Sequence, residues 1–259
     1  MRPGLAVVTG ASAGIGREFC EQLAERGHDL LLVARDAGRL GALKTDLEGR
    51  RGIRAEVHPA DLSLEADIVR LAERLAQGEA PALLVNNAGF GTRGTLLEVQ
   101  PDLQAAMVRL HALAPMRLTM AVLPGMVRRG GGAVVNVSSV AGFIHSAGNV
   151  NYCATKAYLT NFTEGLAAEL RGTGVQAQAL CPGFTHTEFH QRMRVGTGGL
   201  PRMAWMSAAS VVRASLRSLD RRGPVVCVPG LGYKLLVPLI RLTPRPVLGW
   251  AIALRRARM

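Results

Sequence analysis

Two side chains four residues apart, Tyr152 and Lys156, form the chemically most suggestive pair in the sequence. On a helix they would project from one face, because residues i and i+4 are neighbours there. A free tyrosine has a pKa of about 10, and a nearby ammonium group favours its phenolate form. We therefore expect Lys156 to lower the pKa of Tyr152, so that the phenol exchanges a proton as a general acid or base near neutral pH.

A glycine-rich turn, TGASAGIG at residues 9–16, follows the first apolar run and precedes a helical pattern. Glycine lets the chain turn sharply, and the N–H groups at a helix N-terminus bind phosphate oxygens. The spacing GxxxGxG differs from the more common GxGxxG, and a purely structural turn is the alternative interpretation. Its place after the first strand favours a site for the pyrophosphate of a dinucleotide. The residues assigned to this site are Gly10, Ser12, Gly14, Ile15 and Gly16.

The second apolar run ends in Ala34 and Arg35, where an acidic residue would bind the ribose 2′-hydroxyl of NAD. A guanidinium group suits a 2′-phosphate instead, through paired charge-assisted hydrogen bonds. The sequence therefore predicts NADP(H) as the cofactor in preference to NAD(H). Two points weigh against this prediction: Asp36 follows immediately, and a solvated surface arginine would look the same in the sequence.

Short β-rich runs alternate with longer stretches of helical periodicity along most of the chain. The expected strands are Leu5–Thr9, Leu30–Ala34, Ile53–Val57, Leu83–Asn86, Ala133–Val137, Val175–Leu180 and Val225–Val228. Nearly continuous apolar strands joined by helical crossovers indicate a parallel sheet covered on both faces. We therefore expect an α/β fold, doubly wound, with a mostly parallel seven-stranded sheet and helices on both faces, which is a Rossmann fold. Its ligand crevice should lie at the carboxyl ends of the strands.

Further motifs stand at the ends of the later strands. Asp61 follows the third strand, NNAG at residues 86–89 follows the fourth, and a Pro-Gly pair at residues 182–183 follows the sixth. Ser139 follows the fifth strand and precedes the YCATK segment, residues 152–156, by thirteen positions. Together with the glycine-rich turn, these motifs resemble the short-chain dehydrogenase/reductase family.

The resemblance covers residues 4–190 and implies an NADP(H)-dependent oxidoreductase that reduces a carbonyl to an alcohol. In the family's mechanism Tyr152 would donate a proton to the carbonyl oxygen, Ser139 would hydrogen-bond that oxygen, and Lys156 would also hold the nicotinamide ribose. The PGxxxT pattern after the sixth strand would approach the nicotinamide carboxamide or the phosphates, with a plain turn as the alternative. The cofactor-binding residues implied in addition are Asp61, Leu62, Asn87, Ala88, Gly89, Pro182, Gly183, Thr185 and Thr187.

One position departs from the family pattern, because its usual catalytic asparagine aligns with His111. In the family this site holds a relay water largely through its backbone carbonyl. Pro115 lacks the N–H that would bind the carbonyl four residues back, so we expect a local irregularity of the helix and a free carbonyl at His111. Two roles of the imidazole stay open: it carries protons itself as a catalytic group, or it packs and positions its neighbours.

The C-terminal quarter differs from the rest of the chain in charge. Residues 190–259 hold 13 Lys/Arg and a single acidic residue, whereas residues 1–189 hold 18 Lys/Arg and 18 Asp/Glu. This asymmetry indicates an anionic partner, such as a phosphate-bearing substrate or an acidic membrane surface, with a merely solubilising surface as the alternative. Nucleic acid is not expected.

The 259 residues predict one domain, residues 1–259, with a substrate-covering lobe at residues 186–222 and a basic, apolar C-terminal tail at residues 230–259. The tail either contacts a membrane peripherally or packs on the lobe or a second subunit. An apolar pocket suits a hydrophobic ketone or aldehyde, including a 3-oxoacyl thioester whose phosphates meet basic residues. The apolar candidates are Phe184, Phe189, Met193, Leu200, Met203, Trp205 and Met206, and the basic ones are Arg192, Arg194 and Arg202.

The remaining expectations concern location, assembly and a rival function. No secretory signal is visible, so a cytoplasmic protein is expected, and the four scattered cysteines favour neither a metal nor a disulfide. The resemblance implies a homodimer or homotetramer. The rival interpretation is an NADP(H)-binding regulatory or sensor protein of the same fold without turnover, but such a protein has no need of the Ser139, Tyr152 and Lys156 set.

Overall fold

A parallel β-sheet forms the centre of the computed structural model, which describes residues 3–92, 94–188 and 205–244. Its seven strands run in the order β3-β2-β1-β4-β5-β6-β9, and every neighbouring pair is parallel. They are β1 (Ala6–Thr9), β2 (Leu30–Ala34), β3 (Ala55–Pro59), β4 (Leu83–Asn86), β5 (Gly132–Val137), β6 (Val175–Leu180) and β9 (Val226–Cys227). All seven expected strands are therefore confirmed, although the third begins two residues later than expected.

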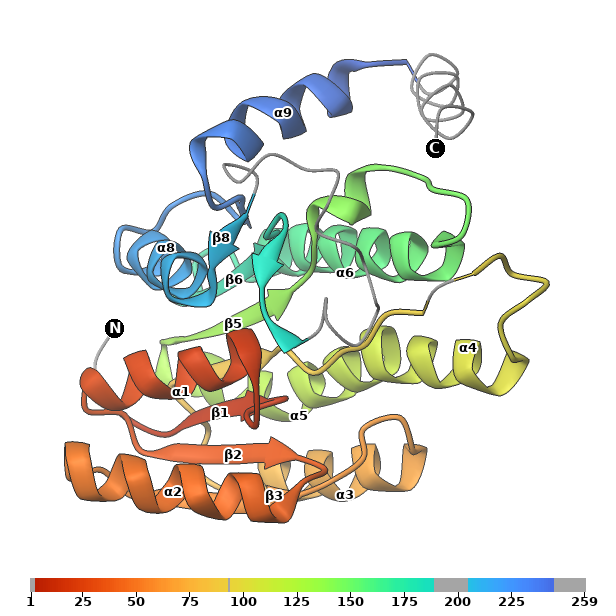
Figure 1. Cartoon of the computed structure of the whole chain (residues 1–259). Helices are drawn as coiled ribbons and strands as arrows, with labels where there is room; N and C mark the ends of the chain where they lie inside the picture. Colours follow the sequence, from red (N-terminus) through yellow and green to blue (C-terminus); the bar gives the residue numbers. More distant parts are fainter. Residues whose placement is uncertain (1–2, 93, 189–204, 245–259) are drawn as a thin grey trace.

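Helices cover both faces of the sheet (Figure 1). One face packs against α1 (Gly14–Glu25), α2 (Ala37–Arg51) and α8 (Ala208–Asp220). The other packs against α3 (Glu65–Gln77), α5 (Ala114–Arg129) and α6 (Val150–Glu169). The remaining elements are α4 (Pro101–Val108), α9 (Leu231–Leu242), the short helices η1 (Arg109–Leu113) and η2 (Val140–Phe143), and a two-stranded pair, β7 (Thr185–His186) with β8 (Met206–Ser207).

The strand sequences explain why both faces are covered. Successive side chains of a strand point to opposite faces, so Val7 packs with one helical layer while Ala6 and Val8 pack with the other. The same alternation places Leu30 and Leu32 opposite Leu31 on β2. Because apolar residues occupy both sets of positions, burial on one face alone would leave half of them in water. The doubly wound architecture is confirmed.

The strand order places the ligand crevice. From β1 the chain moves outward to β2 and β3, and it then returns to the other side of β1 for β4. The connections after β1 and β4 therefore leave the sheet toward opposite faces and open a crevice at their carboxyl ends. The glycine-rich turn follows β1 and the NNAG motif follows β4, so the topology brings together two segments that are more than 70 residues apart.

The helical stretch Pro101–Arg129 is interrupted by a π-helical turn, η1, in which the N–H of Ala114 binds the carbonyl of Arg109 five residues back. Pro115 follows directly, and the local irregularity expected there is present. By length and composition alone this stretch could cross a membrane. Its buried side chains, among them Leu118 and Val122, instead belong to the core beneath the sheet, which accounts for its hydropathy.

Candidate active site

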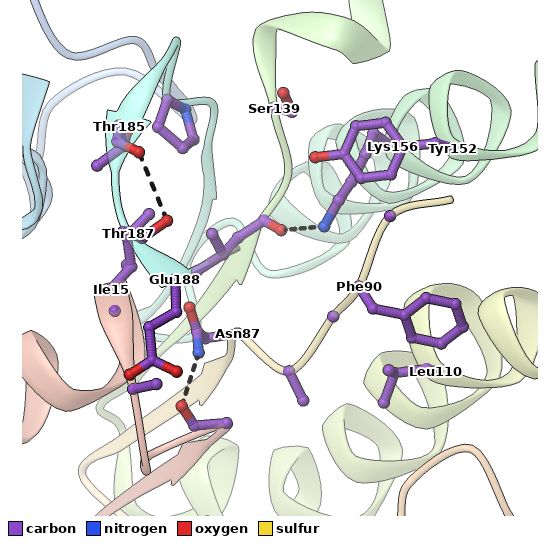
Figure 2. Close-up of a pocket in the computed structure, with 18 of the residues that line it drawn as sticks. Ile15, Asn87, Phe90, Leu110, Ser139, Tyr152, Lys156, Thr185, Thr187 and Glu188 are labelled. Atoms are coloured by element: carbon purple, nitrogen blue, oxygen red, sulfur yellow. Dashed lines mark hydrogen bonds between the residues drawn. The ribbon is translucent and has the colours of Figure 1, made fainter. Parts of the chain in front are cut away.

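A cavity of about 750 Å³ opens at the carboxyl ends of the strands (Figure 2). All residues predicted for the site lie in the described part of the chain, and of these only Gly16 and His111 do not line the cavity. The predicted residues that line it are Gly10, Ser12, Gly14, Ile15, Arg35, Asp61, Leu62, Asn87, Ala88, Gly89, Ser139, Tyr152, Lys156, Pro182, Gly183, Thr185 and Thr187. The fold thus brings seven separate segments of the chain to one site.

The glycine-rich turn leaves the N-terminus of α1 open to the cavity. Within the described residues, Ala13 at the N-cap position provides no side-chain cap, and the first turn carries no acidic residue. The amide groups and the positive end of the helix dipole are therefore available for an anion. Gly10 adopts a φ of +66°, and Thr187 stands across from Gly14, where an added Cβ would lie 3.2 Å from it. This cradle fits a pyrophosphate group.

Gly16 has a packing role instead of lining the cavity. A Cβ at this position would lie 2.2 Å from the carbonyl oxygen of Gly10 and 2.4 Å from the Asn87 side chain. No residue other than glycine fits there without moving backbone. Gly16 thus allows α1 to approach the end of β1 closely, which sets the direction of the helix N-terminus toward the cavity.

Hydrogen bonds join the glycine-rich turn to the NNAG segment. The hydroxyl of Thr9 accepts from the backbone N–H groups of Asn87 and Ala88, at 2.9 and 3.0 Å. The Asn87 side chain donates to the Thr9 carbonyl at 2.9 Å and lies beside the cavity in Figure 2. These bonds hold the two sides of the crevice in one register. Sequence reasoning did not assign Thr9 to the site, because its role depends on this long-range contact.

Arg35 lies at one end of the cavity and is accompanied by a second guanidinium group, that of Arg39. Asp36, the residue that weighed against NADP(H), is the N-cap of α2, and its side chain accepts from the Arg39 N–H at 3.0 Å. The Arg39 side chain also pairs with Glu188 at 3.1 Å, across the cavity opening. Arg39 was not predicted, although its place four residues after Arg35 was a usable signal.

Asp61 lies near the same end and is held in place by hydrogen bonds. The hydroxyl and the backbone N–H of Ser63 both donate to its carboxylate, at 2.6 and 3.0 Å. Partial burial raises the pKa of Asp61, but these hydrogen bonds, followed by the charge of Arg35 3.8 Å away, lower it below its ordinary value. The carboxylate stays ionised and can orient toward a polar ligand in the cavity.

Tyr152 and Ser139 face the same part of the cavity from α6 and from the end of β5 (Figure 2). Ser139 caps η2, and its oxygen accepts from the Ala141 N–H at 3.1 Å, which leaves its hydroxyl hydrogen available as a donor. Burial raises the pKa of Tyr152 to about 12, and a hydrogen bond from Ser139 opposes this rise. The phenol is therefore protonated at neutral pH and is a proton donor.

The expected lowering of the Tyr152 pKa by Lys156 is wrong for this structure. The Lys156 ammonium group lies 5.8 Å from the centre of the phenol ring and donates to the carbonyl of Val137 at 2.8 Å. Burial lowers the pKa of Lys156 itself to about 8, so that its charge is costly in this environment. The two groups share one helix face, as predicted, but burial and not the ammonium group decides the direction in which the pKa of Tyr152 shifts.

His111 lies behind Tyr152 and uses both nitrogens of its ring in structural contacts. Nε2 accepts from the backbone N–H of Phe90 at 3.1 Å, and Nδ1 lies 3.0 Å from the hydroxyl of Thr155. Since Nε2 is an acceptor, the proton of the neutral ring is on Nδ1, and Thr155 in turn donates to the carbonyl of Tyr152 at 3.0 Å. Burial, and then the charge of Lys156, hold the pKa of His111 well below its ordinary value.

This geometry favours the positioning role of His111 over proton transport. The ring connects the loop after β4 to the segment of α6 that carries Tyr152, and the imidazole and phenol rings pack edge to face with their centroids 5.8 Å apart. Gly89 leaves room for it, because a Cβ there would lie 2.9 Å from the ring. That the carbonyl of His111 holds a relay water stays a prediction.

Apolar side chains line part of the cavity. They include Phe90, Leu110, Ile144, Cys153 and Phe184, of which sequence reasoning named only Phe184. Two other predicted lobe residues are described: Trp205 packs on Phe184 and His186, and Met206 packs against the core. The other seven lie outside the described residues: Phe189, Met193, Leu200 and Met203 among the apolar candidates, and Arg192, Arg194 and Arg202 among the basic ones.

Known proteins are similar to this chain in sequence and in fold. The family model of the short chain dehydrogenases matches residues 4–197. A 3-oxoacyl-[acyl-carrier-protein] reductase of Vibrio harveyi is 34% identical over 185 residues, 71% of this chain and 74% of that protein. A short-chain dehydrogenase of Sphingobium yanoikuyae, solved with NADPH, is 38% identical with a TM-score of 0.83, over 88% of each chain.

A third relative is the bulky-bulky ketone specific alcohol dehydrogenase of Comamonas testosteroni. Its structure is 34% identical with a TM-score of 0.80, and the match covers 89% of this chain and 88% of that one. The structural neighbours include complexes with NADPH and with NAD. The family model matches most of the chain, and the glycine-rich turn lies in one cavity with the serine, the tyrosine and the lysine. This chain therefore belongs to the short-chain dehydrogenase family.

Proposed function

We propose that this protein is an NADP(H)-dependent oxidoreductase that reduces a hydrophobic ketone or aldehyde to an alcohol. The observation that carries the proposal is the protonated phenol of Tyr152, hydrogen-bonded by Ser139, in one cavity with the open α1 N-terminus and Arg35. An acid is what the reduction needs at the carbonyl oxygen.

Ser139, Tyr152 and Lys156 have different roles in the proposed reduction. When it is bound in the cavity, the nicotinamide supplies a hydride to the carbonyl carbon. The Ser139 hydroxyl donates a hydrogen bond to the carbonyl oxygen, which stabilises the negative charge that develops there. Tyr152 transfers its phenolic proton to the same oxygen and completes the alcohol. Lys156 donates to the carbonyl of Val137 and lines the same cavity, where by the family resemblance it would hold the nicotinamide ribose.

The preference for NADP(H) is supported by Arg35 and Arg39 and by the use of Asp36 as a helix cap. We expect Arg35→Ala and Arg39→Ala each to raise the KM for NADPH by about tenfold, because each removes a charge-assisted hydrogen bond to the 2′-phosphate. The KM for NADH should change little. Steady-state kinetics with both cofactors measures this, and Arg54→Ala, at an exposed arginine remote from the cavity, is the matched control.

Equal losses with NADPH and NADH would contradict the proposed preference. They would show that the two arginines stabilise the crevice itself and do not recognise the phosphate.

The apolar lining of the cavity supports a hydrophobic substrate, and the relatives named for 3-oxoacyl and bulky ketone substrates agree with this class. A 3-oxoacyl thioester is a narrower proposal, since it needs basic residues to meet its phosphates. NADPH oxidation with acyl thioesters, compared with free ketones of equal chain length, tests it. We expect a higher kcat/KM with the thioesters, and equal values would exclude a role for their phosphates.

A broad carbonyl screen with NADPH and NADH tests the enzymatic function as a whole. Tight NADPH binding without turnover of any carbonyl or alcohol would favour the rival sensor function.

Assembly as a homodimer or homotetramer is a further proposal, supported by exposed apolar side chains on α4, α5 and α6: Leu103, Met120 and Tyr158. The cytoplasmic location stays a prediction.

A further inference from the structure

Among the described residues, helix α9 is held on the body of the protein by one side. Val237 is buried against the end of β6, and the N–H of Phe184 donates to the hydroxyl of Tyr233 at 3.2 Å. One turn beyond Val237, Arg241 pairs with Glu164 of α6 at 3.2 Å. The three anchoring residues are spaced by four positions, so they form one face of the helix. These contacts fix which side of α9 faces outward.

The outward side carries a row of leucines, which we call the leucine stripe: Leu231, Leu235, Leu239 and Leu242. Their exposed fractions are 81%, 77%, 63% and 83%. Their spacing of four, four and three residues puts them on one face, opposite the anchored side. Within the described part of the chain, nothing covers this face. Four adjacent exposed leucines mark an interaction surface, since single exposed leucines are common but contiguous ones are not.

The charge of the C-terminal sequence points to an anionic partner for the leucine stripe. Residues 221–259 hold eight Lys/Arg and no Asp/Glu, and Lys234 is exposed on α9 itself. A second copy of the chain would bring these positive charges together, which is unfavourable. An apolar helix face among basic residues is instead the pattern of helices that lie in the interface of anionic membranes.

We propose that the leucine stripe of α9 docks this protein on an anionic lipid surface. Figure 1 shows α9 along the outside of the molecule, at the end opposite α2. The anchored side of the same helix contacts Phe184, which lines the cavity. The leucine stripe lies on the opposite side of the helix from this contact, so α9 stands between the docked surface and the site, and docking would leave the contact of Tyr233 in place.

Vesicle co-sedimentation of the full chain tests the docking without any activity measurement. We expect binding to phosphatidylcholine vesicles that contain phosphatidylglycerol, and much weaker binding to phosphatidylcholine alone. Leu235→Ser with Leu239→Ser should lower the partition coefficient by about tenfold or more, because two apolar side chains no longer enter the bilayer. Lys234→Gln should lower it by about fivefold, and high salt should do the same.

The matched control is the pair Leu96→Ser with Leu97→Ser, two exposed leucines on a different surface, which should bind as the unchanged protein does. Thermal unfolding verifies that each variant is folded. Absence of binding to anionic vesicles overturns the proposal, and so does a loss that is equal in the α9 and control variants. If the α9 variants instead dissociate an oligomer in sedimentation velocity without changing lipid binding, a second copy covers the stripe. Because none of these readouts uses turnover, their failure is distinct from failure of the proposed reductase function.

Discussion

Replacing Tyr152 by phenylalanine is expected to lower kcat by about 10²–10⁴-fold, the range that general acid catalysis contributes. The substitution removes only the hydroxyl group, so that the ring still packs against His111. The affinity for NADPH, measured by the change in protein fluorescence, should stay within a few-fold. A single-turnover experiment with excess enzyme then shows that the chemical step itself is slow.

Ser139→Ala provides the comparison for this variant. It removes the hydrogen bond to the carbonyl oxygen and to the phenol but keeps the proton donor, so a smaller loss is expected. Turnover of the phenylalanine variant within tenfold of the unchanged enzyme would remove Tyr152 from the mechanism, and with it the observation on which the proposed function depends.

Replacing His111 by alanine is expected to destabilise the fold by about 2–5 kcal/mol. The change opens a cavity in a buried region and leaves the N–H of Phe90 and the hydroxyl of Thr155 without the partner they have now. Chemical denaturation measures the loss. His111→Asn should destabilise less, because the amide retains one of the two hydrogen bonds.

The same asparagine variant separates positioning from proton transport. If the imidazole only positions Tyr152, kcat falls in both variants while the pH–rate profile keeps its shape, and His111→Asn recovers part of the rate lost in His111→Ala. A profile that loses a titration step in the asparagine variant would show instead that the ring carries protons.

The burial of His111 also predicts how stability depends on pH. Its pKa is lowered in the folded state from an ordinary value of 6.5. Below pH 6.5 the unfolded chain therefore binds a proton that the folded protein does not, and the free energy of unfolding falls as the pH falls, by about 1.4 kcal/mol per pH unit at most for one group. His28 and His58 are shifted in the same direction by burial. The difference between the unchanged protein and His111→Asn isolates the part due to His111, and parallel pH curves would contradict it.

Sequence alone determined the sheet and the positions of the motifs on it. A strand buried on both faces is apolar along nearly its whole length, and this local signal is clear in β1, β2 and β4. The more polar β3 and β6 could be placed from the alternation of short β-rich runs with helical stretches. The glycine-rich turn was readable for a similar reason. Gly10 requires a positive φ, and Gly16 sits where no side chain fits. The glycine-rich turn and the serine of the active site could be located as well, because each follows the carboxyl end of a strand, where a doubly wound sheet binds its ligands.

Tertiary structure decided the properties that depend on burial and on partners distant in sequence. Spacing predicts that Tyr152 and Lys156 share a helix face, but the direction of the phenol pKa follows from burial, which spacing does not reveal. Because α2 begins at Ala37, Asp36 is its N-cap, and Arg39 lines the same cavity as Arg35. The leucines of α9 form an exposed surface because Tyr233, Val237 and Arg241 hold the opposite side of the helix on the protein. The burial of a residue and its long-range contacts depend on residues that are distant in the sequence. A local sequence pattern therefore cannot predict them.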